Sequence, residues 1–99
     1  MNLETIKTIS ESKVVVLDLF ANWCTPCKTL GPILDEALPN HDFIFLKINV
    51  DENVPLSKEL SVQSIPTVLA LKGGEVIDRF IGSQSKSFVE SWLKGLDDV

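Results

Sequence analysis

The chain has few of the residues that cross-link a protein or bind a metal. Its 99 residues include two cysteines, Cys24 and Cys27, and one histidine, His41. A disulfide between cysteines so close in sequence closes too small a loop to stabilise a fold through chain entropy. A structural zinc site needs about four ligands. These counts exclude a disulfide-stabilised miniprotein and a zinc ribbon, and we expect no bound metal.

Positive charge is scarce as well. Nine Lys and Arg residues stand against fourteen Asp and Glu residues, for a net charge of −5. Because nucleic acids and anionic membranes bind clusters of basic side chains, we expect neither as a partner. No apolar run approaches the roughly 20 residues of a membrane-spanning helix. Residues 1–12 also lack the basic start and the apolar stretch of a signal peptide, which predicts a cytoplasmic protein.

What the chain does contain is an alternation of helical and strand patterns, within a length that fits one domain over residues 1–99. Apolar residues at helical spacing predict helices at 2–11, 26–38, 55–60 and 86–96. Apolar runs predict strands at 13–20, 43–50, 67–72 and 75–81, the last two joined by the hairpin signal Gly73-Gly74. A helix joins the first two strands, so these should be parallel. We predict an α/β fold with a mixed four-stranded sheet flanked by helices.

The two cysteines lie in Cys24-Thr25-Pro26-Cys27, directly after a predicted strand and at the start of a helix. Unpaired N–H groups at a helix N-terminus stabilise a thiolate, the nucleophilic form of cysteine. Cys24 is nearer the helix end, so we expect it to be exposed and Cys27 to be shielded. The pair could form a reversible disulfide. Half of a metal site, or two incidental thiols, is the alternative.

Charged residues interrupt the two apolar strands. If Asp18 is buried, its pKa rises and it becomes a plausible proton acceptor near neutral pH. An Asp exposed at a strand end is the alternative. Lys47 lies in the second strand, where it is either close to Asp18 across a parallel pair or directed from an edge strand into solvent.

Two further residues stand out near the predicted strand ends. Pro66 follows Ile65 just before the hairpin; an X-Pro bond is the usual setting for a cis peptide, although trans is far more frequent. Trp23 directly precedes Cys24. It is either a core residue or a contact surface for a partner.

Together these motifs resemble the thioredoxin family. The similarity extends over residues 13–96 and rests on DLFANWCTPCKTLGPILDEAL at 18–38, KINVDEN at 47–53, SIPTVLALKGGE at 64–75, and Gly82. It implies a thioredoxin fold in which Cys24 attacks, Cys27 resolves, and Asp18 assists Cys27 with Lys47 beside it. Pro66 would be a cis-proline packed against the disulfide. The rim that docks substrates would comprise Trp23, Thr25, Pro26, Val50, Ile65, Ile81 and Gly82.

The chain departs from the family pattern at three places. Thr25 stands where glycine is typical. We expect its hydroxyl to accept an N–H bond and stabilise the Cys24 thiolate, which would weaken the protein as a reductant. The alternative is that the stiff β-branched side chain pre-sets the closed loop, which would make the protein a stronger reductant. Phe20 stands where many members have tryptophan. The sequence before the first core strand is short, so we expect the N-terminal edge strand to be missing.

The resemblance predicts a monomeric protein-disulfide reductase with no cofactor beyond the Cys24–Cys27 disulfide. Its partners would be disulfide-containing proteins and a separate thioredoxin reductase, because the chain has no GxGxxG motif for a dinucleotide. A thiol oxidase or isomerase is an alternative that needs an oxidising compartment. A glutaredoxin-like enzyme fits the Thr-Pro dipeptide less well. A binding or assembly subunit of the same fold is a further alternative.

Overall fold

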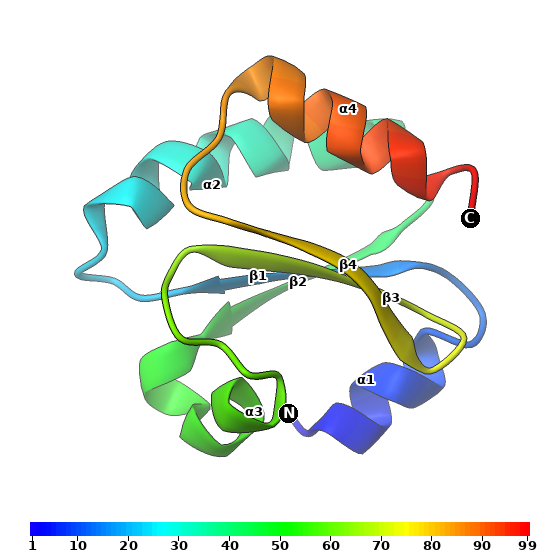
Figure 1. Ribbon diagram of the computed structural model, residues 1–99, viewed down its shortest axis with the longest axis horizontal. Helices are drawn as coiled ribbons and strands as arrows, with labels where there is room; N and C mark the ends of the chain where they lie inside the picture. The colour runs from blue at the N-terminus through cyan, green and yellow to red at the C-terminus, as the bar shows by residue number, and fades with distance from the viewer.

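The computed structural model describes residues 1–99 and contains a four-stranded sheet with helices on both faces (Figure 1). In chain order the elements are α1 (Leu3–Ile9), β1 (Val15–Phe20), α2 (Thr25–Ala37), the 3-10 helix η1 (Leu38–Asn40), β2 (Ile44–Asn49), the 3-10 helix η2 (Val50–Glu52), α3 (Val54–Glu59), β3 (Thr67–Lys72), β4 (Glu75–Ile81) and α4 (Lys86–Leu96). The predicted fold class is confirmed, and every predicted helix and strand is present.

The strands lie in the order β2-β1-β3-β4. As predicted, β1 and β2 are parallel, and β3 and β4 form an antiparallel hairpin. Residues before β1 form α1, so β2 is an edge of the sheet and no N-terminal strand covers it. Val50, expected to end the second strand, instead begins η2.

The alternation of side chains along β1 divides the core into two layers. Val15, Leu17 and Leu19 belong to the cluster that includes side chains of α1 and α3. Val16 belongs to the cluster with α2 and α4, which lie together on the opposite face of the sheet (Figure 1). Asp18 lies two residues after Val16 and therefore faces the same α2 side, in the part of the strand that leads to the cysteines.

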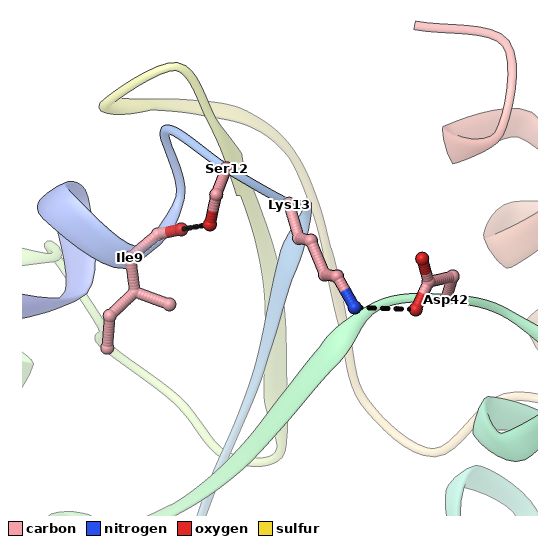
Figure 2. A network of polar contacts seen from close by, with 4 residues as sticks. All are labelled: Ile9, Ser12, Lys13 and Asp42. Carbon is pink, nitrogen blue, oxygen red and sulfur yellow. Dashed lines mark hydrogen bonds and ion pairs between the residues drawn. The ribbon is translucent and has the colours of Figure 1, made fainter.

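Surface contacts hold the turn after α1 against the segment before β2. Lys13 Nζ forms an ion pair with Asp42 Oδ1 at 2.8 Å, and the Ser12 hydroxyl donates to the Ile9 carbonyl at 3.1 Å (Figure 2). Both ends of the ion pair are exposed, with 47% and 88% of the side chains accessible. Such a pair contributes little to stability.

Ser10 makes a stronger link between α1 and the β3–β4 hairpin. Its carbonyl accepts from the Gly73 N–H, and its hydroxyl oxygen accepts from the Gly74 N–H, both at 2.9 Å. Ser10 is only 1% exposed. Gly73 and Gly74 have φ of 61° and 82°, the left-handed region that glycine adopts most readily. These two hydrogen bonds from Gly73 and Gly74 to Ser10, called the Ser10 clasp below, hold the hairpin against the end of α1.

The Ser10→Ala variant should lower the free energy of unfolding by about 1–3 kcal/mol, because the partly buried Gly74 N–H loses its acceptor. Urea denaturation followed by circular dichroism measures the change. Ser12→Ala is the matched control, since the Ser12 hydroxyl is exposed, and it should change stability by less than about 0.5 kcal/mol. Equal changes in the free energy of unfolding for the two variants would contradict the proposed contribution of the Ser10 clasp.

Candidate active site

The cysteine pair lies at the junction between β1 and α2. Cys24 is the N-cap of α2, and its Sγ accepts a hydrogen bond from the Cys27 N–H at 3.2 Å. Cys24 and Cys27 form a disulfide, with Cα atoms 5.3 Å apart. Pro26 occupies the first turn of α2, where its missing N–H is not needed. The sequence therefore directs Cys24 Sγ to the end of the helix that stabilises a thiolate.

The predicted contrast in exposure between the cysteines is wrong for this disulfide state. Cys24 is 4% exposed and Cys27 is 6% exposed. Both pack with Ala21, and Phe20 and Ile65 cover this small cluster. The reason is that the N-cap position turns Cys24 Sγ inward toward the Cys27 N–H.

A cleft of about 490 Å³ distinguishes the two cysteines, although their exposed fractions do not. Cys24 lines this cleft and Cys27 does not. The lining comes from the start of α2, from η2, from α3 and from the loop before β3; it comprises Trp23, Cys24, Thr25, Pro26, Val50, Ser57, Val62, Gln63, Ser64 and Ile65. None of these ten residues is charged. Below, this surface is called the cleft.

The cleft gathers five of the seven predicted rim residues: Trp23, Thr25, Pro26, Val50 and Ile65. Sequence reasoning missed Ser57, Val62, Gln63 and Ser64. Gln63 and Ser64 directly precede Ile65, so their position in the sequence could have identified them as lining residues. Nothing local marked Ser57 or Val62, because they reach the cleft only through the packing of α3.

Trp23 is a surface residue and not part of the core. It is 69% exposed. Its Nε1–H donates to Asp51 Oδ2 at 2.9 Å, which orients the indole at the wall of the cleft. The Asp51 N–H in turn donates to Asn49 Oδ1 at 3.0 Å. Asp51 was not singled out from the sequence, because 28 residues separate it from Trp23.

The remaining predicted rim residues lie beside Pro66. The Ile65–Pro66 peptide bond is cis, as the family resemblance implied. The Gly82 N–H donates to the Pro66 carbonyl at 2.8 Å, and Ile81 pairs with Thr67 across the hairpin. Ile81 is 54% exposed, but neither it nor Gly82 lines the cleft. Both residues lie next to Pro66, outside the cleft, and Gly82 is half-buried.

Asp18 is buried, so the exposed alternative is wrong. It is 4% exposed. Burial raises its pKa from 3.8 to about 6; the charge of Lys47 lowers this value and that of Asp35 raises it, both to a smaller extent. Lys47 is the partner of Asp18 in the β1–β2 register, yet its Nζ pairs with Asp35 at 2.7 Å. Lys47 therefore lies opposite Asp18 across the parallel pair, and its side chain is also exposed to solvent, so each of the two alternatives is correct in part.

No group of three or more His, Cys, Asp or Glu side chains is arranged to hold a metal ion. His41, the third soft ligand in the sequence, contacts Asp97 through Nδ1 at 3.0 Å and stacks on Phe43. None of the helices is both long enough and apolar enough to span a bilayer.

Comparison with known proteins agrees with this geometry. The family model described as Thioredoxin matches residues 4–95. A thioredoxin of Mycoplasmoides gallisepticum is 41% identical over 92 residues, which cover 92% of each chain. A mitochondrial thioredoxin of Bos taurus is 36% identical over 91% of this chain, which spans only 55% of that protein.

Solved structures show the same likeness. The reduced Schistosoma mansoni thioredoxin pre-protein superposes with a TM-score of 0.81 at 35% identity, covering 95% of this chain and 89% of that one. The Fasciola hepatica thioredoxin has a TM-score of 0.81 at 30% identity, covering 93% and 89%. With its cysteine pair closed at the start of α2, the chain belongs to the thioredoxin family and is a thiol-disulfide redox protein.

Proposed function

We propose that the chain is a protein-disulfide reductase that works as a single domain and a monomer in the cytoplasm. The observation that carries this proposal is that Cys24, alone of the two cysteines, lines an open uncharged cleft at the N-terminus of α2. A protein substrate can therefore approach Cys24 while Cys27 stays behind it. The family supports the chemistry, and the cleft supports the order in which the cysteines act.

In the first step the Cys24 thiolate attacks one sulfur of a substrate disulfide. A bond forms between Cys24 Sγ and that sulfur, the substrate disulfide breaks, and the second substrate sulfur leaves as a thiolate. The N-terminus of α2 and the Cys27 N–H favour the Cys24 thiolate. The surface that contacts the substrate in the cleft comprises Trp23, Thr25, Pro26, Val50 and Ile65. Ile81 and Gly82 extend this surface beside Pro66.

In the second step Cys27 loses its proton and attacks Cys24 Sγ. The mixed disulfide breaks, the first substrate sulfur leaves, and the protein retains the Cys24–Cys27 disulfide; two electrons have passed to the substrate. Asp18 is the proposed acceptor of the Cys27 proton, because a carboxyl with a pKa of about 6 is ionised at neutral pH but retains affinity for a proton. Lys47 and Asp35 adjust that affinity.

The oxidised protein then needs two electrons to start again. The proposed donor is a separate thioredoxin reductase. Insulin reduction tests the whole cycle: with NADPH and a bacterial thioredoxin reductase, the chain should reduce insulin while one NADPH is consumed for each disulfide. NADPH consumption that persists in a Cys24→Ser variant would contradict the proposal.

Thr25 is expected to adjust the redox potential through its stiffness. It is the first residue of α2 and is exposed, and the N–H bond expected for its hydroxyl goes to Cys24 Sγ instead. A glycine would give the open dithiol loop more conformational freedom than the closed disulfide loop. The Thr25→Gly variant should therefore be a weaker reductant by about 20 mV, for a difference of about 1 kcal/mol.

Equilibration with glutathione buffers measures this potential. The Thr29→Gly variant is the control, because Thr29 lies outside the cysteine loop in the same helix and the substitution should affect both redox states alike. A Thr25→Gly protein that reduces more strongly than wild type would instead favour a role for the hydroxyl.

A further inference from the structure

The cleft has an acidic edge that nothing in the chain neutralises. Asp51 reaches the cleft through its hydrogen bond to Trp23, which uses only Oδ2. Glu52 follows it in η2, and both residues are exposed. The ion pairs of the structure involve other acids, namely Asp42, Asp97, Asp35 and Glu36. The charge at this edge is thus available to a bound molecule.

The rest of the cleft offers no competing charge. Its walls are apolar at Trp23, Val50, Val62 and Ile65, with small polar groups elsewhere. Two cations lie near lining residues in the chain, Lys28 two positions after Pro26 in α2 and Lys58 directly after Ser57 in α3, but neither lines the cleft. A peptide beside Cys24 would therefore meet an apolar surface with negative charge at the η2 end.

We propose that the cleft selects substrate disulfides by charge, taking segments that place an apolar residue in the cleft and a Lys or Arg near Asp51. This inference rests on the proposed reductase function. Opposite charges at the rim of an interface steer encounter and suppress partners of the wrong sign. A substrate with Glu at the same place would face Asp51 and Glu52 across an uncharged surface and be disfavoured.

The test uses short neutral peptides that contain one intramolecular disulfide and differ at a single residue. Lys, Gln or Glu is placed in turn at each of the three positions on either side of the attacked cysteine. At low salt, kcat/KM should be about three- to tenfold higher for Lys than for Glu at one or more positions, as expected for a partly screened charge contact. The ratio should decrease toward one in 1 M salt, where the Debye length is about 3 Å.

The Asp51→Asn variant separates the charge of Asp51 from its role in positioning the Trp23 indole. Asparagine keeps an oxygen acceptor for the Trp23 indole but has no charge, so the Lys-to-Glu ratio should decrease while Trp23 fluorescence remains as in wild type. Asp98→Asn changes the net charge equally at the exposed C-terminal end and should keep the ratio of wild type. The Asp51→Glu variant should restore the Lys-to-Glu ratio, because it keeps a carboxylate at the same edge.

The outcomes distinguish this inference from the proposed function. If the peptides are reduced but the Lys-to-Glu ratio stays within twofold at every position, charge selection is overturned and the reductase function stands. An unchanged ratio in Asp51→Asn would also overturn the assignment to Asp51. If no peptide is reduced whatever its charge, the proposed function itself fails.

Discussion

The Cys27→Ser variant is expected to stop turnover and to remain covalently bound to its substrate. Cys24 Sγ can still form the mixed disulfide, but a serine hydroxyl cannot resolve it by thiol–disulfide exchange. The rate of insulin reduction should decrease to the background rate. Mass spectrometry of the unreduced mixture should show one substrate chain attached to Cys24.

The Cys24→Ser variant is the matched control and should form no adduct, because Cys27 does not line the cleft. Alkylation of the reduced wild-type protein near neutral pH should accordingly modify Cys24 first. Substrate trapped on Cys27, or faster alkylation of Cys27, would reverse the two roles. The burial of both cysteines in the disulfide does not decide this result, since the reaction begins from the dithiol.

The Asp18→Asn variant should be more stable than wild type at alkaline pH and equally stable at acidic pH. The pKa of Asp18 is raised from 3.8 to about 6 in the folded protein, so the folded state disfavours the charged carboxylate. As pH rises from about 4 through 6, the unfolded chain releases this proton before the folded one does, and wild type loses stability. Above pH 7 the penalty reaches about 3 kcal/mol, which the variant avoids.

Urea denaturation at pH 4 and at pH 8 measures this effect. Asp42→Asn is the control, because its exposed side chain pairs only with Lys13 and should give the same small change at both pH values. A stability difference for Asp18→Asn that is independent of pH would contradict a raised pKa. In the same variant, insulin reduction should slow because the proton acceptor for Cys27 is lost; unchanged turnover from pH 6 to 9 would remove Asp18 from the mechanism.

The sequence alone determined the features that depend on neighbours in the chain. Alternation in β1 predicts that Asp18 shares a face with Val16, whereas its burial was left open by the sequence and is decided by the structure. The glycine pair at 73–74 predicts the hairpin, since a two-residue turn needs φ values that glycine adopts readily. The position of Cys24 between a strand and a helix predicts a reactive cysteine at the N-terminus of that helix. Each of these follows from local backbone geometry.

The tertiary structure decided which distant residues complete the site. The Trp23–Asp51 hydrogen bond joins the start of α2 to η2, and Ser57 reaches the cleft only because α3 packs beneath the same sheet. The Ser10 clasp spans 64 residues. No periodicity in the sequence encodes such contacts, because they depend on how separate elements pack. The inward turn of Cys24 Sγ likewise required the cap geometry and the packing of Ile65 against the disulfide.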